Sequence, residues 1–471
     1  MSKQYYTTIG LEIHAELKTN SKMFCGCINN PDEEKPNTNV CPVCMAHPGT
    51  LPVINKKAVE SVIKVGLALN SNIADFTEFD RKNYFYPDIP KAYQISQYKY
   101  PIVSGGTLNG VDITRIHLEE DTANNKHDRG NYSLVDFNRA GVPLMELVTE
   151  PVIHSAKEAG DFGRELQLLL RCLNVSEANM EKGEMRVELN ISISDDPNKF
   201  GTKVEVKNIN SFKAVERAAE YEIKRMSALL DEDRGAEIVQ ETRGWDENKQ
   251  STFSQRSKEN ANDYRYFPDP DLPKLYLSKA FDMQKLKSEL PELPQAKRLR
   301  YKNEYGIKDE DIESYIVDIT LGSWFEEVAK VLKDKEKIKT ASNYITSDYI
   351  GIKKSNESAS LPSTSNFVEL INMVTDGQIS SRAAKDILAM IVIENDSPMK
   401  IATEKDLIQK NDEGALKEIV ERVIDANPQV IATYKGGKEN ALMSLVGQIM
   451  KETKGSANPA LVQKILKELL G

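Results

Sequence analysis

The clearest hydrophobic pattern in this chain is a strict alternation over residues 9–17. Apolar side chains take the odd positions, and Glu12, His14 and Glu16 take alternate positions between them. A period of two is typical of a β-strand with one face on a core. The pattern therefore predicts a half-buried strand that presents Glu12 beside His14, where both can reach one ion or one phosphate.

Further patterning predicts more strands and the helices between them. Residues 185–194 and 203–210 also alternate, and a turn-like Asp-Asp-Pro-Asn sequence lies between them, so we expect neighbouring antiparallel strands. Ser155 and Ser211 are placed to cap helices over residues 156–173 and 212–230, which carry apolar residues at helical spacing. The first half of the chain is therefore expected to be a large α+β domain.

The pattern changes character near Pro291 and Pro294. Beyond them the chain is predominantly helical, and a Ser-rich stretch at 354–366 reads as an exposed linker or loop. The predicted layout has three parts: a strand-rich domain over residues 1–292, a helical domain over 293–405 and a small helical tail over 406–471.

Composition narrows the class of protein. The chain has 471 residues, 40% hydrophobic content and a net charge of −10, with no apolar run near the roughly 20 residues that span a bilayer. No signal-peptide core begins it, so we expect a cytoplasmic location and no membrane partner. The acidic balance argues against a non-specific nucleic-acid coat. From Lys435 to Gly471 the chain has six Lys against three Glu, which fits either a local basic surface or a solvated helical face.

Four of the five cysteines lie within twenty residues. They are Cys25, Cys27, Cys41 and Cys44, and the second pair has the spacing of a metal knuckle. In an intracellular protein such pairs favour a tetrahedral zinc site over disulfides. A redox dithiol and unliganded cysteines are the alternatives.

Carboxylates also interrupt two apolar segments, residues 117–122 and 143–151. A buried charge is costly unless it is paired or bound to a cation, so these acids are candidate partners for Glu12 and His14. Oxygen ligands with one imidazole suit Mg²⁺ or Mn²⁺, which commonly accompany phosphate chemistry. The alternative is that each carboxylate is exposed or salt-bridged.

Other segments indicate binding surfaces. Residues 81–97 and 263–271 are rich in aromatic side chains and proline, which favours a binding loop over a packed structural loop. Lys207 and Asn208 precede the helix capped by Ser211, a position suited to an anion. The chain lacks phosphate-loop, dinucleotide-binding, zinc-protease and nucleophile-elbow motifs, so ATP would have to bind at a non-standard site.

Taken in order, these segments closely resemble the B subunits of the tRNA-dependent amidotransferases, which convert Glu-tRNA(Gln) and Asp-tRNA(Asn) to the amides. The resemblance spans nearly the whole chain and runs through I-G-L-E-I-H-A-E-L (9–17), N-T-N-V-C-P-V-C (37–44), R-K-N-Y-F-Y-P-D-I-P-K-A-Y-Q-I-S-Q (81–97), S-L-V-D-F-N-R-A-G-V-P-L-M-E-L (133–147), V-K-N-I-N-S-F (206–212), Q-E-T-R-G-W-D (240–246), D-Y-R-Y-F-P-D-P-D-L-P (263–273) and G-Q-I-M-K-E-T-K-G-S-A-N-P (447–459).

The resemblance implies that an ATP-derived phosphoryl group activates the side-chain carboxylate of the misacylated residue, and that ammonia from a glutaminase A subunit displaces phosphate. It implies Mg²⁺ held by Glu12, His14, Glu120 and Glu146. Glu120 is chosen over Glu119 by the family resemblance alone, since strand parity would let Glu119 share a face with His117.

The resemblance further implies that Arg139, Lys207 and Asn208 offset phosphate charge. It also implies a structural Zn²⁺ on the four cysteines. Glu188 stands where many relatives have Asp, which weakens a ligand role there.

The expected partners are the A subunit and a small C subunit in a heterotrimer, together with misacylated tRNA(Gln) or tRNA(Asn). The cognate non-discriminating synthetase is a further candidate, and the tail would contact the outer corner of the tRNA. The competing hypotheses are a non-catalytic zinc-containing tRNA scaffold, and a carboxylate kinase or ligase that acts on a small molecule.

Overall fold

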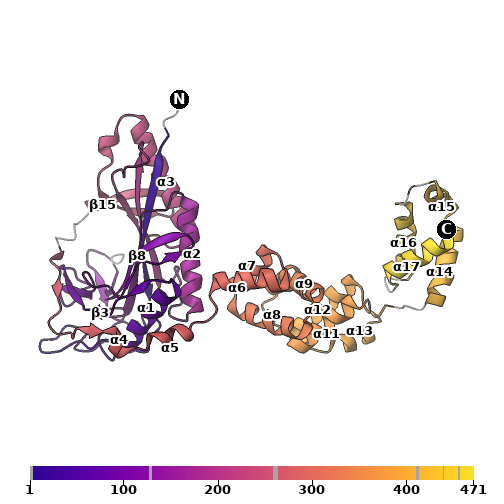
Figure 1. The fold of residues 1–471 in the computed structure, drawn as a ribbon, viewed down its shortest axis with the longest axis horizontal. Helices are drawn as coiled ribbons and strands as arrows, with labels where there is room; N and C mark the ends of the chain where they lie inside the picture. The colour runs from indigo at the N-terminus through magenta and orange to yellow at the C-terminus, as the bar shows by residue number, and fades with distance from the viewer. Residues whose placement is uncertain are drawn as a thin grey trace. The chain divides into compact units, whose positions relative to one another are not determined.

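The chain forms two compact units, 1–294 and 295–471 (Figure 1). The computed structural model describes residues 4–126, 130–257, 264–409, 413–436, 438, 440–453 and 457–471. All the named strands belong to the first unit, and the second unit is built of helices. The predicted α+β class is therefore confirmed. The three-part division of the chain stays a prediction.

A ten-stranded sheet forms the body of the first unit. Its order is β15-β14-β13-β12-β1-β11-β8-β6-β2 with β7 paired to β8, and its pairs are antiparallel except β13 with β14. The strands are β1 (Tyr6–Glu16), β2 (Asn72–Ile73), β6 (Val103–Ser104), β7 (Thr107–Leu108), β8 (Val111–Glu120), β11 (Pro143–Thr149), β12 (Met185–Ser194), β13 (Val204–Lys207), β14 (Glu241–Asp246) and β15 (Ser251–Ser257). The strands predicted at 9–17, 185–194 and 203–210 are β1, β12 and β13.

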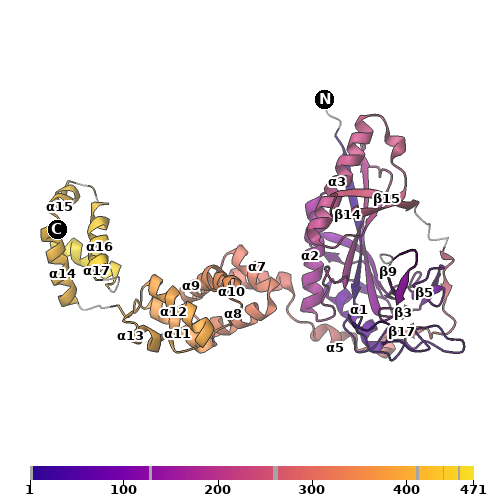
Figure 2. The same ribbon diagram turned by 180° about the vertical axis from the view of Figure 1, so that it is seen from behind.

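One face of this sheet is apolar and packs on helices. Ile9, Leu11, Ile13 and Ala15 of β1 are almost completely buried in one core with residues of α1 (Lys56–Ala68), α2 (Ala156–Cys172) and α3 (Phe212–Asp231). Figure 2, in which the molecule is seen from behind, shows α2 and α3 beside the sheet. Ser155 and Ser211 accept hydrogen bonds from Glu158 N and Ala214 N, so both predicted caps are confirmed.

The opposite face of the sheet is polar, and a smaller sheet lies at the end of β8. That sheet has the order β16-β4-β5 and consists of β16 (Phe267–Pro268), β4 (Asp80–Asn83) and β5 (Tyr93–Ser96). Gln94 of β5 donates a 2.7 Å hydrogen bond to the carbonyl of Glu120. The remaining elements of the unit are β3 (Phe76–Thr77), β9 (Asn124–Lys126), β10 (Leu134–Asp136), η1 (Gly235–Glu237), β17 (Leu275–Tyr276), α4 (Leu277–Ala280) and α5 (Met283–Ser288).

The second unit is a succession of helices. They are α6 (Pro294–Arg300), α7 (Asp309–Val317), α8 (Ile319–Leu332), α9 (Lys335–Asn343), α10 (Ile350–Ser355), α11 (Thr364–Thr375), α12 (Ser381–Glu394), α13 (Pro398–Glu404), α14 (Glu413–Ala426), α15 (Pro428–Lys435), α16 (Ala441–Glu452) and α17 (Pro459–Leu470), with π-helical turns at Tyr301–Tyr305 and Tyr344–Tyr349. Helices α14, α16 and α17 share a core that includes Leu445 and Leu466. Two charged residues counted in the tail, Glu439 and Lys454, lie outside the described residues.

The Ser-rich stretch is a loop within the second unit, and Glu357, Ser358 and Ser360 in it are exposed, as predicted. It joins α10 to α11, Ala359 is buried, and Trp324 Nε1 donates a 3.0 Å hydrogen bond to the carbonyl of Pro362. In the described part of the chain, no helix combines the length and the apolar character that a membrane crossing requires.

Candidate functional site

The centre of the polar face is assembled by strand register. His14 on β1 lies opposite Glu146 on β11, and Glu146 lies opposite His117 on β8. Residues opposite each other in an antiparallel pair point to the same face, so the three side chains form one row. Glu12 and Glu119 are two positions from His14 and His117 along their strands and therefore share this face.

The side-chain atoms of this row are in contact. His14 Nε2 lies 3.3 Å from Glu119 Oε1 and 3.2 Å from Glu146 Oε2, and His117 Nε2 lies 3.6 Å from the same Glu146 oxygen. Ligand atoms of Glu12, His14 and Glu146 all lie within 4.8 Å of one another, as do those of His117, Glu119 and Glu146. We call Glu12, His14, His117, Glu119 and Glu146 the acidic centre.

A second group of carboxylates continues the acidic centre across β12 and β13. Ligand oxygens of Glu12, Glu188 and Glu205 also lie within 4.8 Å of one another. Lys207 Nζ is 2.7 Å from a Glu188 oxygen, and Thr242 Oγ1 donates a 2.6 Å hydrogen bond to Glu205. Lys207 therefore already has a carboxylate partner, whereas no described residue donates a hydrogen bond to the carboxylate of Glu12.

The charges of the acidic centre are strongly coupled. Burial together with Glu146 and Glu188 raises the pKa of Glu12 to about 7. Burial alone would lower the pKa of His14, but its hydrogen bonds with Glu119 and Glu146 raise that pKa well above its ordinary value. Burial would raise the pKa of Glu146, but His117 and His14 hold it well below the ordinary range. Crowding of this kind is relieved when a cation is bound.

The donor set of the acidic centre fits a hard divalent cation. Carboxylate oxygens with one or two imidazoles are the ligands that Mg²⁺ and Mn²⁺ accept. The buried Nδ1 atom of His117 has no hydrogen-bond partner among the described residues. The site therefore holds one polar atom that the protein itself leaves unsatisfied, which is the kind of exception expected at a functional site.

The structure does not bring Glu120 to the acidic centre. Glu120 points away from Glu119, because successive residues of a strand face opposite sides. Lys91 Nζ lies 2.7 Å from Glu120 Oε1, and the backbone N–H of Ile95 donates a 3.0 Å hydrogen bond to the same oxygen. Glu119 stands where the family resemblance led us to expect Glu120.

The predicted phosphate-binding residues are placed differently from one another. Lys207 lies next to Glu12 and Glu188. Arg139 donates hydrogen bonds to the carbonyls of Thr122 and Ala123, at 3.0 and 3.1 Å, and Asn208 donates to the carbonyl of Trp245 at 3.0 Å. The side chains of Arg139 and Asn208 are therefore engaged with the backbone, and their role toward phosphate stays a prediction.

Sequence reasoning missed several residues of the site. Arg115 Nη2 lies 3.4 Å from Glu146, and its position two residues before His117 on one strand is the signal that could have found it. Lys82 on β4 is a second case. Burial would lower the pKa of Lys82, but the carboxylates of Glu119 and Glu146 raise it. Only the packing of the small sheet against β8 places that cation near the acidic centre.

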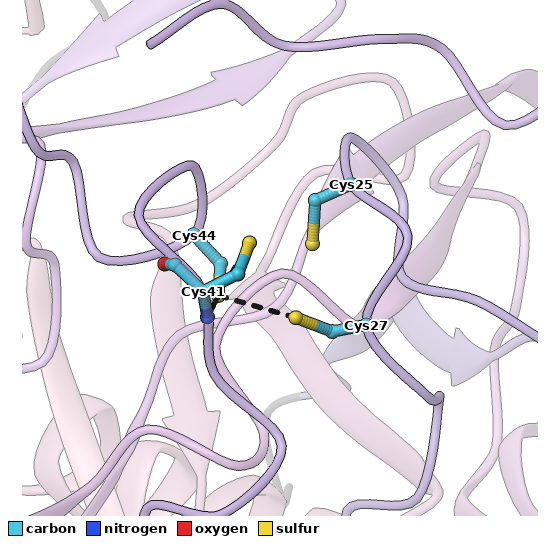
Figure 3. Close-up of side chains that lie close together, drawn as sticks. All are labelled: Cys25, Cys27, Cys41 and Cys44. Atoms are coloured by element: carbon cyan, nitrogen blue, oxygen red, sulfur yellow. Dashed lines mark hydrogen bonds between the residues drawn. The ribbon is translucent and has the colours of Figure 1, made fainter.

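The four cysteines gather as predicted. Cys25 and Cys27 come from one loop and Cys41 and Cys44 from another, with their side chains turned toward one another (Figure 3). The Cys44 sulfur lies 3.9 Å from Cys41 Sγ and 4.0 Å from Cys27 Sγ, and all four sulfurs lie within 4.8 Å. A hydrogen bond from Cys25 lowers the pKa of Cys44 to about 5. Four convergent thiols fit a tetrahedral metal ion such as Zn²⁺.

Comparison with known proteins agrees with these motifs. Residues 7–282 match the GatB/GatE catalytic domain, and residues 323–470 match the GatB domain. The chain is 44% identical over 485 residues to a protein of Brevibacillus brevis, with 100% of this chain and 99% of that protein covered. Proteins of Thermodesulfovibrio yellowstonii and Caldanaerobacter subterraneus are 44% and 45% identical, with 99% of each chain covered. All three relatives are named as the B subunit of an aspartyl/glutamyl-tRNA(Asn/Gln) amidotransferase. With both domains matched along the length of the chain, this protein belongs to the GatB family.

Proposed function

We propose that this chain is the B subunit of a tRNA-dependent amidotransferase and that it activates the side-chain carboxylate of misacylated Glu-tRNA(Gln), Asp-tRNA(Asn) or both. The observation that carries the proposal is the convergence of His14, Glu119 and Glu146 from three strands, with Glu12 beside them. Full-length similarity to proteins named as such subunits supports it.

The proposed reaction has two balanced steps. A carboxylate oxygen of the aminoacyl group attacks the γ-phosphorus of ATP, ADP leaves, and an acyl phosphate forms. Ammonia then attacks the carbonyl carbon, phosphate leaves, and the amide remains on the tRNA. The attacking carboxylate is already an anion, so the first step needs no strong base. It needs charge neutralisation and alignment instead.

The residues of the acidic centre would supply both the charge neutralisation and the alignment of the reacting groups. Glu12, His14, Glu119 and Glu146 would hold Mg²⁺, which supplies positive charge against the phosphates when it is bound. Lys207 and Lys82 add fixed positive charge at the two sides of the centre, since each lies near one of its carboxylates. Glu119 replaces Glu120 in this ligand set because it contacts His14.

The proposal also assigns roles to the four cysteines, to the partner subunits and to the helical tail. The four cysteines would hold a structural Zn²⁺. A glutaminase A subunit and a small C subunit would complete the complex and provide ammonia. The helical tail over residues 406–471 has its own core at α14, α16 and α17, and we assign it the contact with the outer corner of the tRNA.

The test is an amidation assay with the chain purified together with its A and C partners. Glu-tRNA(Gln), ATP, Mg²⁺ and ammonium are supplied, and Gln-tRNA formation is measured. We expect wild type to form product and Glu12→Gln and His14→Ala to lose about a hundredfold or more in rate, as when one charge-stabilising group is removed. Glu150→Gln and His154→Ala are matched controls at exposed positions and should retain activity.

Two other outcomes would favour the competing functions. Undiminished rates in Glu12→Gln and His14→Ala would show that the reaction does not take place at the acidic centre. Absence of product with either misacylated tRNA, and of ATP hydrolysis stimulated by it, would favour a tRNA-binding scaffold. ATP turnover without tRNA would favour a small-molecule ligase.

A further inference from the structure

The two aromatic segments of the sequence, 81–97 and 263–271, meet in the small sheet, although residues 98–262 lie between them. Phe267 of β16 lies opposite Arg81 of β4. Arg81 Nε lies 2.8 Å from Asp269, and Asn83 Nδ2 donates a 3.2 Å hydrogen bond to the carbonyl of Tyr264. The described part of the second segment begins at Tyr264, and its first residue, Asp263, lies outside the described residues. The junction is thus fixed by strand pairing, an ion pair and a side-chain hydrogen bond.

This junction lines up four tyrosines. The rings of Tyr98 and Tyr266 stack with centroids 4.4 Å apart and planes 10° from parallel. Tyr266 meets Tyr264 edge to face at 6.1 Å, and Tyr264 meets Tyr84 at 5.8 Å. We call these four residues the tyrosine row. Tyr98, at its outer end, is 52% exposed, so an aromatic surface faces solvent there.

The tyrosine row approaches the acidic centre through Lys82. Lys82 Nζ lies 5.0 Å above the ring centroid of Tyr264. Lys82 is opposite Gln94 in the small sheet, so it shares a face with Ser96, and Ser96 Oγ donates a 3.1 Å hydrogen bond to Glu119. No carboxylate of the described chain pairs with the Lys82 ammonium at ion-pair distance. A ring surface and an available cation therefore lie beside the acidic centre.

We propose that the tyrosine row is the stacking surface for the 3′-terminal adenosine of an aminoacyl-tRNA, with Lys82 facing the side-chain carboxylate of the amino acid that the tRNA carries. Flat aromatic rings bind nucleobases by stacking in many single-stranded nucleic-acid sites. The inference rests on the proposed function, because that function requires the aminoacyl end of a tRNA to reach the acidic centre.

The span from base to reacting atom favours tRNA over ATP as the occupant. In an aminoacyl-tRNA, one ribose and a short side chain separate the terminal base from the reacting carboxylate. In ATP, the ribose and two further phosphates separate adenine from the γ-phosphorus. Tyr266, on which Tyr98 stacks, lies near Lys82 and Glu119, and Lys82 in turn lies over the ring of Tyr264. The shorter span matches a ring surface on Tyr98 that only Tyr266 separates from Lys82 and Glu119.

The direct test uses glutamyl-tRNA with 2-aminopurine in place of the terminal adenine, because stacking quenches the fluorescence of this base. Wild-type complex should quench the signal on binding. Tyr98→Leu should lose most of the quenching and bind about tenfold more weakly, a typical loss for one stacked base. Tyr98→Phe keeps the ring and should behave as wild type. Tyr6→Leu is the matched control, since Tyr6 is 37% exposed and eight residues before His14 on β1.

A second measurement separates the two sources of adenosine. The KM for ATP in the amidation assay should be unchanged in Tyr98→Leu, while the KM for the misacylated tRNA rises about tenfold. A higher KM for ATP with normal 2-aminopurine quenching would show that the row holds the nucleotide, and would overturn the proposal. Equal quenching in wild type and Tyr98→Leu would overturn it as well.

The fluorescence assay also separates this inference from the proposed function. It reports base stacking and requires no turnover. Quenching that depends on Tyr98, together with no amidation by wild type, would contradict the proposed reaction and leave the base-binding surface in place. Amidation by wild type without quenching would support the proposed reaction and contradict the base-binding surface.

Discussion

The acidic centre and the four-cysteine cluster are both candidate metal sites in the first unit, but they are assembled in different ways. The cysteines lie between residues 25 and 44, so two neighbouring loops suffice to bring them together. The acidic centre takes residues from β1, β8 and β11, which span positions 12 to 146. Its members depend on the register of two strand pairs, and a shift of one residue would turn them to the other face.

The two sites also differ in how they carry charge. In the cysteine cluster the Cys44 sulfur lies about 4 Å from the sulfurs of Cys27 and Cys41, and it accepts a 3.1 Å hydrogen bond from the backbone N–H of Cys41. The acidic centre combines carboxylates with imidazoles and has positive side chains at its sides, so it is already partly neutralised. A local motif can thus be recognised from spacing, whereas a site built across a sheet can be recognised only when its register is known.

The first pair of variants distinguishes Glu119 from Glu120 as a ligand of the acidic centre. Glu119→Gln removes a carboxylate that contacts His14, so we expect the Mg²⁺ concentration for half-maximal amidation to rise about tenfold or more. Glu120→Gln changes a residue paired with Lys91 and should leave this Mg²⁺ requirement near the wild-type value. The measurement is a Mg²⁺ titration of the amidation rate with free ammonium. A shift in Glu120→Gln alone would restore the assignment drawn from the family resemblance.

Replacement of one cysteine should abolish metal binding at the four-cysteine cluster and leave the acidic centre unchanged. Structural zinc contributes on the order of 10 kcal/mol to small zinc domains, so Cys44→Ser should lose bound zinc and expose residues 25–44 to protease. Zinc content by atomic emission and limited proteolysis provide the check. Cys172→Ser is the matched control, because Cys172 lies in α2 outside the cluster. Full zinc content in Cys44→Ser would contradict a four-cysteine site.

The third prediction concerns Glu326, a carboxylate of the second unit that already has positively charged partners. Burial would raise the pKa of Glu326, but hydrogen bonds from Arg300, Tyr301 and Lys297 lower it from 4.5 to about 2. A lowered pKa means that ionised Glu326 stabilises the fold above its ordinary pKa, and that this stability is lost as the pH falls from about 4.5 to about 2.

The corresponding variant is Glu326→Gln. At pH 7 we expect it to lower the free energy of unfolding by about 1 to 2 kcal/mol, since solvent screens a side chain that is one-fifth exposed. The difference from wild type should shrink at pH 3. Urea unfolding at both values measures it, with Glu468→Gln as the exposed control. An equal difference at both pH values would mean that the ion pairs do not stabilise the ionised carboxylate.

Much of the site could be predicted from local pattern. The period of two over residues 9–17 placed Glu12 and His14 on one polar face, and β1 has that face. The spacing of the cysteines indicated their cluster, and Ser155 and Ser211 indicated two helix starts. These features depend on residues close together in the chain, where backbone geometry alone decides which side chains share a face.

The tertiary structure decided what local pattern left open. The pairings of β1 with β11 and of β11 with β8 brought Glu119 to His14, while Glu120 was directed to Lys91. Packing of the small sheet brought Lys82 to the acidic centre, and pairing of β16 with β4 aligned the tyrosines. The physical reason is common to these cases. Contacts between strands depend on register and on which surfaces bury each other, and neither quantity is encoded in any single short segment.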